Sequence, residues 1–335
     1  MKILLTGSAG FIGFHTAKAL CETDHEVIGI DNLNDYYDVS LKQARLDQLE
    51  RKSNFHFIKS DLANNFDIQK LFENQKFDFV IHLAAQAGVR FSLENPYAYL
   101  NSNITGFLNI LEGCRNHPIK HLVFASSSSV YGLNQTIPFS EDQNVDHQVS
   151  FYGATKKSNE VMAHSYSHLY NIPITGLRYF TVYGPWGRPD MSPFIFAKSI
   201  MDDKPIKVFN HGNHRRDFTY IDDVVKGTLR ALKCTPTSDH NWSALNPKPN
   251  SSKAPYKIYN IGNSQPVELL YYIECLEKSL GKKAIKEMLP LQPGDVEHTF
   301  ADNSSLMKTT GYNPNTPIEK GVEIFAKWFL NYYYS

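Results

Sequence analysis

Tyr152 and Lys156, four residues apart in the run SFYGATKKS, are the first residues of this chain whose types and spacing suggest chemistry. Residues four apart in a helix lie on one face, one turn from each other. A tyrosine that accepts a proton near neutral pH needs a cation beside it, because its free pKa is about 10. The lysine supplies that charge, and a hydroxyl of the serine run FASSSSVYG (124–132) can relay the proton. Such a pair alone is common on exposed helices, so its meaning depends on the rest of the chain.

The N-terminus carries a glycine-rich loop, TGSAGFIG, in which Gly7, Gly10 and Gly13 follow the first expected strand and open the first expected helix. Glycines there permit a tight turn and a close approach of the backbone to a pyrophosphate, which the helix N-terminus then faces. Asp31 ends the second strand, 18 residues after Gly13. A carboxylate there accepts hydrogen bonds from ribose hydroxyls and repels a 2′-phosphate, which favours NAD over NADP.

Two alternatives stay open for these acidic residues. Asp31 can instead form a turn before Asn32. Asp61 and Leu62 end the third expected strand, where they can meet an adenine, although a solvated loop aspartate is nearly as good an interpretation.

Apolar runs that alternate with helical patterns indicate the elements that position these residues. KILLT, EVIGID, HFIKSD, FVIHLA, HLVFAS and ITGLRYF read as strands, and a helix is expected from Phe11 to about Thr23. This alternation predicts an α/β fold, a Rossmann-type doubly wound parallel sheet with a smaller C-terminal α/β lobe. We expect a nucleotide-binding domain over residues 1–175 and a substrate-binding lobe over 176–335 that is interleaved with the sheet. Residues 234–257 read as a surface loop, and late helices are expected at 267–280 and 318–332.

Composition narrows the class of protein. The chain has 335 residues, and Lys plus Arg equal Asp plus Glu at 34 each, so no charge surplus favours nucleic acid or an anionic membrane as partner. Four scattered cysteines are typical of free thiols in a reducing compartment. The N-terminal apolar run is too short for a signal peptide, and no stretch approaches the roughly 20 apolar residues of a membrane span. We expect a soluble, cytoplasmic protein, and the 13 histidines show no metal-ligand spacing.

Several segments together resemble the extended short-chain dehydrogenase/reductase family, in particular its nucleotide-sugar 4-epimerases, over about residues 2–330. These segments are TGSAGFIG, DNLNDYYD, LAAQAGVR, SSSSVYG, YGATK, RYFTVYGPWGRPDM, RRDFTYIDDVV, YNIGN and LQPGDV. Within that family the chain is most similar to the UDP-glucuronate 4-epimerases.

The resemblance assigns roles to individual residues. It implies that Tyr152 is the catalytic tyrosine and that Lys156 is its partner on the nicotinamide ribose. Ser127 is the third member by register, four residues before Tyr131, although Ser126, Ser128 and Ser129 are adjacent. The residues implied to bind NAD are Gly7, Gly10, Phe11, Ile12, Gly13, Asp31, Asn32, Asp61, Leu62, Leu83, Ala84, Ala85, Asn103, Lys156 and Tyr179.

The implied chemistry is a reversible oxidation at C4 of the sugar. The tyrosinate takes the 4-hydroxyl proton with the help of Ser127, while hydride passes from C4 to NAD. The 4-keto sugar then turns in its pocket and receives hydride on the other face, so NAD acts as a tightly held prosthetic group.

The serine run discriminates among relatives on the same scaffold. The related 4,6-dehydratases carry an Asp-Glu pair after the catalytic hydroxyl, and UDP-glucuronate decarboxylases usually carry a glutamate at the second of these positions. This chain has Ser128 and Ser129 there, which disfavours elimination and decarboxylation. A non-catalytic NAD-binding regulator is the remote alternative, disfavoured because Ser127, Tyr152 and Lys156 are all present.

Two departures from the galactose-type epimerases favour an acidic sugar over a neutral UDP-hexose. Those enzymes carry Asn after RYF and Arg three residues before the late GD aspartate, whereas this chain has Thr181 and Gln292. A buried sugar carboxylate needs a cation or several hydroxyl donors. The candidates for this clamp are Arg90, Ser128, Ser129 and Thr181.

Other residues are expected on the UDP moiety. Arg188 and Arg216 suit a diphosphate, with pairing to Asp190 or Asp217 as the alternative, and Asp295 can bind the ribose or form a turn. The resemblance also predicts a homodimer through the helix that carries Tyr152 and a helix near 98–115.

Overall fold

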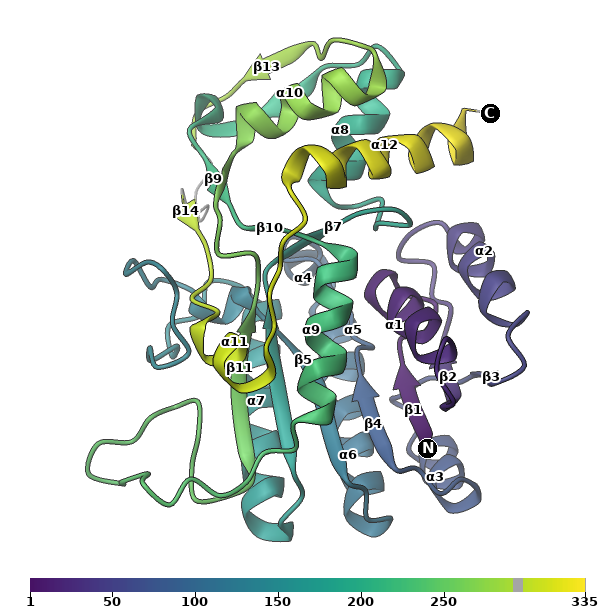
Figure 1. Ribbon diagram of the computed structural model, residues 1–335, viewed down its shortest axis with the longest axis vertical. Coiled ribbons are helices and arrows are strands. Elements are labelled where there is room, and N and C mark those ends of the chain that lie inside the picture. The colour runs from purple at the N-terminus through teal and green to yellow at the C-terminus, as the bar shows by residue number, and fades with distance from the viewer. Residues whose placement is uncertain (292–297, 335) are drawn as a thin grey trace.

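A seven-stranded parallel sheet forms the centre of the computed structural model, which describes residues 1–291 and 298–334 (Figure 1). The strand order is β11-β6-β5-β4-β1-β2-β3, and every neighbouring pair is parallel. The strands are β1 (Lys2–Thr6), β2 (Glu26–Asp31), β3 (Phe55–Lys59), β4 (Phe79–His82), β5 (His121–Ser127), β6 (Ile174–Tyr179) and β11 (Tyr256–Ile261). The order reverses direction between β1 and β4, which is where ligands bind in doubly wound sheets. The expected Rossmann-type fold is confirmed.

Helices cover both faces of this sheet, and the first strand shows why. Ile3 and Leu5 pack into one core with α1 (Phe11–Cys21), α2 (Val39–Leu49) and α9 (Ile221–Lys233). Leu4, between them, points to the opposite core with α3 (Asn65–Asn74), α6 (Gly106–Asn116) and α7 (Phe151–Tyr170). Because successive strand residues face opposite sides, a strand buried on both faces is apolar without alternation.

A smaller lobe lies beyond the carboxyl ends of the strands, where Figure 1 shows α8, α10 and α12 gathered at one end of the molecule. It contains α8 (Ser192–Met201), α10 (Leu269–Leu280), α12 (Ile318–Tyr333) and the paired strands β8 (Ile206–Val208) and β13 (Lys286–Met288). The predicted boundary at residue 175 falls inside β6, and β11 comes from the second segment, so both segments contribute strands to one sheet. The division into two domains stays a prediction.

Short elements complete the described chain. They are α4 (Phe91–Glu94), α5 (Pro96–Tyr99), the π-helix η1 (Leu100–Thr105), the 3₁₀ turns η2 (Ser128–Tyr131) and η3 (Phe209–Gly212), β7 (Thr181–Tyr183), β9 (Arg215–Arg216), β10 (Phe218–Tyr220), β12 (Val267–Glu268), β14 (His298–Thr299) and α11 (Ser304–Thr310). The segment between α9 and β11 is irregular, as its composition predicts. Among the described residues, no helix is long and apolar enough to cross a membrane.

Three histidines whose pKa is lowered in the folded protein predict that the fold is sensitive to acid. Burial lowers the pKa of His15 to about 4, of His82 to about 3 and of His121 to about 4. The unfolded chain binds these protons near pH 6.5 and the folded chain does not, so stability is complete above pH 6.5 and is lost as the pH falls toward 4. In that window, each histidine changes the free energy of unfolding by about 1.4 kcal/mol per pH unit.

Urea unfolding at pH 7.5, 6 and 5 measures this slope. His121→Gln should reduce it, because His121 lies between the Leu232 carbonyl and the Thr175 hydroxyl, both 2.9 Å away. The exposed His240→Gln is the matched control. Equal slopes for the wild type and His121→Gln would refute the assignment.

Candidate active site

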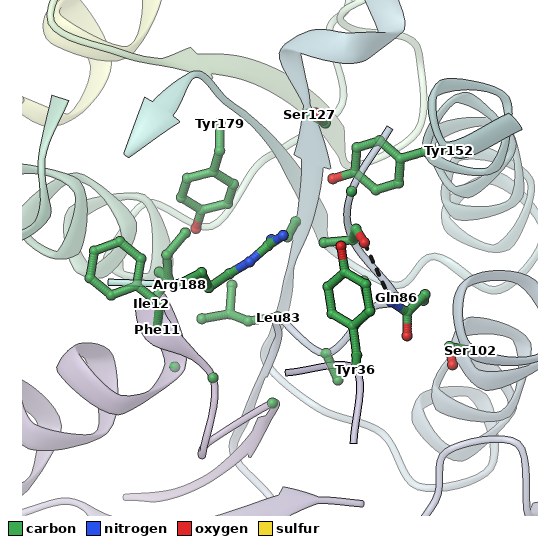
Figure 2. A pocket seen from close by; sticks show the side chains of 18 of the residues that line it. Phe11, Ile12, Tyr36, Leu83, Gln86, Ser102, Ser127, Tyr152, Tyr179 and Arg188 are labelled. Atoms are coloured by element: carbon green, nitrogen blue, oxygen red, sulfur yellow. Dashed lines mark hydrogen bonds between the residues drawn. The ribbon is translucent and has the colours of Figure 1, made fainter. Parts of the chain in front are cut away.

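A cavity of about 380 Å³ lies at the carboxyl ends of the central strands (Figure 2). Its wall contains all three predicted catalytic residues and most of the predicted binding residues. These are Ser127, Tyr152 and Lys156; Gly7, Gly10, Phe11, Ile12, Gly13, Asp31, Asn32, Asp61, Leu62, Leu83, Ala84, Ala85 and Tyr179; and Ser128, Ser129, Thr181 and Arg188. The loops after β1 to β6 therefore converge on one space. Among the described residues, no group of three or more His, Cys, Asp or Glu side chains could hold a metal ion.

The glycine loop forms a cradle in which side chains do not fit. Gly7 has a φ of 73°, and a Cβ on Gly7 would lie 2.8 Å from the amide nitrogen of Ala84. A Cβ on Gly13 would lie 1.9 Å from the carbonyl oxygen of Gly7. The first turn of α1 therefore packs directly on the loop, and its residues Phe11, Ile12 and Gly13 line the cavity. This arrangement fits the pyrophosphate of a dinucleotide.

Asp31 makes the turn contacts that were considered for it, and its role toward a ribose stays a prediction. Its carboxylate accepts hydrogen bonds from the amides of Ala9, at 3.2 Å, and Leu33, at 2.9 Å, and it also lines the cavity. Burial raises its pKa, and the nearby charge of Lys42 opposes that rise. The exposed Asp61 accepts from the side-chain amide of Asn32 at 3.0 Å, which places it at the same end of the cavity. The carboxylates fit the adenosine end of a dinucleotide.

Helix α7 presents Tyr152 and Lys156 on one face, as their spacing predicts. It begins after Ser150, whose hydroxyl accepts from the amide of Gly153 at 3.0 Å and caps the helix. Burial raises the pKa of Tyr152, while a hydrogen bond with Ser127 and the charge of Arg188 lower it. Lys156 donates to the carbonyl of Ala125 at 2.8 Å, and burial lowers its pKa to about 8. In this structure, then, Arg188 supplies the charge that favours the tyrosinate.

The four serines at 126–129 have different surroundings. Ser126 donates to the buried carboxylate of Glu160 at 2.6 Å, so its hydroxyl is already engaged. The Ser127 hydroxyl lowers the pKa of Tyr152 and accepts from the amide of Ser129 at 3.1 Å. Ser128 and Ser129 begin the turn η2 and line the cavity. Of the four serines, Ser127 is therefore the one that acts on the pKa of Tyr152.

Arg188 lines the cavity and is paired with Asp190, while its contact with a diphosphate stays a prediction. Its guanidinium contacts both carboxylate oxygens of Asp190, with Nε at 3.0 Å from Oδ1. The hydroxyl of Tyr36 donates to the same carboxylate at 3.0 Å. Figure 2 shows the Arg188 side chain between Tyr179 on one side and Tyr36 and Tyr152 on the other. Tyr36 lies in the segment DNLNDYYD, but nothing in that segment indicates its contact with Asp190.

Arg45 was also missed, and it fixes the loop that carries Arg188. It is fully buried on α2 and donates to the carbonyls of Ala9, at 2.8 Å, and Trp186, at 2.6 Å. Trp186 has a φ of 62°, a conformation that is rare outside glycine. One guanidinium thus ties the glycine loop to the Arg188 loop. In the sequence it is an ordinary helix arginine, and no motif distinguishes it.

Among the described residues, three that were predicted to bind cofactor or substrate do not line the cavity. Arg90 is exposed, with its guanidinium 5.9 Å from the centre of the Phe209 ring. Arg216 lies in β9 and donates to the Arg215 carbonyl at 3.2 Å. Asn103 lies behind the wall, accepting from the amide of Gln86 at 2.8 Å and donating to the hydroxyl of Thr155 at 3.0 Å. Asp295, like Gln292, lies outside the described residues.

Asp217, the alternative partner of Arg216, is buried and accepts from three backbone amides. These amides belong to Asn263, at 2.6 Å, Ser264, at 3.0 Å, and Ala301, at 2.9 Å. Asp217 therefore ties together three loops of the lobe.

Comparisons with known proteins agree with this geometry. The chain is 54% identical over 333 residues to protein CapI of Staphylococcus aureus, with 99% of each chain covered. It is 46% identical to a probable UDP-glucuronate 4-epimerase of Rhizobium meliloti, covering 98% of this chain and 97% of that protein. The crystal structure of a Bacillus cereus UDP-glucuronic acid 4-epimerase with UDP-glucuronic acid and NAD is 37% identical, with a TM-score of 0.88 and coverage of 99% and 100%. Residues 3–262 match the NAD dependent epimerase/dehydratase family, and the chain belongs to that family.

Proposed function

We propose that the protein is an NAD-dependent UDP-glucuronate 4-epimerase, which interconverts UDP-glucuronate and UDP-galacturonate through a 4-keto sugar. The observation that carries the proposal is one cavity that combines the Ser127–Tyr152 contact, a dinucleotide cradle, and the hydroxyls of Ser128 and Ser129 where eliminating relatives carry acids. The activities named for the Rhizobium meliloti and Bacillus cereus relatives support it.

The chain's own residues hold the sugar and move its proton. When bound, NAD supplies the hydride acceptor and returns the hydride afterwards. Tyr152 takes the proton of the sugar 4-hydroxyl as a phenolate and gives it back at the end, with the Ser127 hydroxyl between them as relay. Arg188 keeps positive charge in the same cavity, which favours the phenolate in a buried place, and Lys156 lines the cavity beside it. Because Tyr152 returns the proton it took, the reaction needs no other reagent.

The sugar carboxylate is proposed to lie against the hydroxyls of Ser128, Ser129 and Thr181. All three line the cavity, whereas Arg90 lies outside its wall. A 4-keto uronate is a β-keto acid that loses CO₂ easily, so a clamp that holds the carboxylate in an unfavourable orbital alignment would protect the intermediate. Hydroxyl donors suit this purpose, because each bonds an anion without opening a path for general acid–base chemistry.

Thr181→Val is expected to raise KM for UDP-glucuronate about tenfold, because the loss of one hydrogen bond to a charged group costs about 1.5 kcal/mol. NMR of the products should also reveal some pentose, since the carboxylate is held less firmly. Thr235→Val, on the exposed segment after α9, is the matched control. If Arg90→Ala raised KM as much as Thr181→Val, the carboxylate clamp would include Arg90 and the proposal of three hydroxyls would fail.

The activity is tested by NMR of UDP-glucuronate incubated with purified protein and no added reductant. UDP-galacturonate without pentose would establish the epimerase. UDP-xylose or a 4-keto pentose would instead indicate a decarboxylase, and turnover of UDP-glucose or UDP-galactose alone would indicate a neutral-hexose epimerase. If no UDP-sugar were converted, the remaining alternative would be a non-catalytic NAD-binding regulator.

We also propose that the protein is a cytoplasmic homodimer, as the sequence predicts. Large apolar side chains are exposed on α7 and on the short helices α4 and α5 that precede α6. Leu93 on α4 is 73% exposed and Tyr97 on α5 is 74% exposed. On α7, Val161 is 58% exposed and Leu169 is 64% exposed. Large apolar side chains that cluster on one face are typical of an interface. Light scattering that returned about the 38.2 kDa of one chain at micromolar concentration would contradict the dimer.

A further inference from the structure

Three consecutive residues at the end of β5 each contact a different residue of α7. The carbonyl of Ala125 accepts from Lys156 at 2.8 Å, the hydroxyl of Ser126 donates to Glu160 at 2.6 Å, and Ser127 acts on Tyr152, whose pKa it lowers. The three helix residues are spaced by four, so they form one stripe along α7. These three contacts set the register between the strand that carries the serine and the helix that carries the tyrosine.

Of these three helix residues, Glu160 has the most tightly held side chain. Arg178 on β6 binds its two carboxylate oxygens at 2.8 and 2.9 Å, and the side chains are 0% and 3% exposed. Charge-assisted bonds of this bidentate kind are short, strong and directional. The carboxylate that accepts from Ser126 is therefore itself held in one orientation.

Arg178, the partner of Glu160, also holds the far end of the turn η2. Arg178 also donates to the hydroxyl of Tyr131 at 3.1 Å, and Tyr131 donates to Asn260 on β11 at 2.7 Å. Tyr131 closes η2, the turn that begins directly after Ser127. Glu160 and Arg178 thus hold the residue before Ser127 and the end of the turn after it, and neither lines the cavity.

We propose that Ser126 and Glu160 are positioning residues that fix the Ser127 hydroxyl against the Tyr152 hydroxyl. Ser127 is the last residue of β5, where the sheet no longer constrains the backbone from both sides. The chain there can shift relative to α7 unless a side chain ties the two together. A misplacement of about 1 Å at a proton-transfer site can cost on the order of 100-fold in rate. The inference rests on the proposed function for its kinetic part only.

Ser126→Ala tests this proposal, because it removes the tether and leaves the Glu160–Arg178 pair intact. We expect kcat for UDP-glucuronate to fall about tenfold with KM nearly unchanged. The acid limb of the kcat–pH profile should move to higher pH, because a displaced Ser127 hydroxyl no longer lowers the pKa of Tyr152. The other groups that face Tyr152 are Arg188 and Tyr99, whose ring lies 6.0 Å away, and both stay in place.

Ser167→Ala is the matched control, because Ser167 is a buried serine on the same helix whose hydroxyl has no hydrogen-bond partner among the described residues. It should leave both kcat and the profile unchanged. A Ser126→Ala enzyme with the wild-type kcat and pH profile would overturn the proposal, even if its stability were lower.

A second readout does not depend on turnover. In protein labelled with ¹³C at tyrosine Cζ, the Tyr152 signal is identified by its absence in Tyr152→Phe, and its titration gives the pKa of Tyr152 directly. Ser126→Ala should raise that pKa, and an unchanged titration would overturn the positioning role. If the wild-type protein converted no UDP-sugar, the proposed function would fail, while this titration would still decide the proposal.

Discussion

Tyr152→Phe is expected to lower kcat for UDP-glucuronate epimerisation by about 10³- to 10⁴-fold while KM changes little. The phenol is the group that takes the sugar proton in the proposed mechanism, and phenylalanine keeps the ring that packs 6.0 Å from Tyr99. Ser127 cannot replace it, since a serine hydroxyl is a much weaker acid than a phenol. The rate is measured by NMR of UDP-galacturonate formation under saturating substrate.

Tyr166→Phe on the same helix is the matched control. Its hydroxyl donates to Glu112 at 2.5 Å on the outer side of α6, away from the cavity wall, so its loss should leave kcat unchanged. The Tyr152→Phe protein should also retain as much NAD as the wild type, because the glycine loop and Asp31 are untouched. A variant that kept more than a tenth of the wild-type kcat would show that another group takes the proton.

The parts of the site that could be predicted from sequence are those set by local geometry. The spacing of Tyr152 and Lys156 places them on one helix face in any helix. Gly7 and Gly13 meet within one strand–turn–helix unit, where a Cβ at either position would clash with backbone. Asp31 ends β2, at a distance from the glycine loop that the βαβ unit dictates. The unbroken apolar run of β1 likewise predicts a sheet that is covered on both faces.

The parts that could not be predicted depend on which distant segments meet. Arg45 contacts Trp186, 141 residues later, and Tyr36 contacts Asp190, 154 residues later. Nothing in either short segment indicates its partner. Arg90 shows the opposite case, because a recognised motif placed it near the cavity and yet its side chain lies over Phe209. A motif fixes where the backbone runs, whereas the direction of a long side chain depends on its neighbours.

Lys156 shows how the two kinds of information combine. Its spacing from Tyr152 predicts a cation beside the phenol, but the same helix face also adjoins the end of β5, where the Ala125 carbonyl accepts from the ammonium. The charge that lowers the pKa of Tyr152 comes from Arg188, on a loop held by Arg45 and Asp190. The local motif thus predicts the residues of the acid–base pair, and the tertiary structure decides which charge acts on it.

Arg178→Met is expected to lower the free energy of unfolding by about 3–5 kcal/mol, because it leaves the carboxylate of Glu160 buried without its counterion. The double variant Glu160→Gln/Arg178→Met should recover much of that loss, since an uncharged pair of similar size carries no buried charge. Denaturant unfolding of the wild type, both single variants and the double variant gives the coupling energy. The exposed pair Lys320–Glu323 provides a control, where removal of Lys320 should cost less than about 1 kcal/mol.

The pH dependence separates the lost counterion from lost packing. Burial alone raises the pKa of Glu160, and in the native protein Arg178 and the Ser126 hydrogen bond hold it below its usual range. Without Arg178, the folded-state pKa of Glu160 should lie above the unfolded value, so its penalty is present at neutral pH and is relieved by protonation as the pH falls. The difference in stability between wild type and Arg178→Met should therefore shrink on acidification, whereas a cavity left by the shorter side chain would cost the same at every pH. A constant difference, together with a double variant as unstable as the single one, would mean that Arg178 stabilises the fold by packing and by its contact with Tyr131.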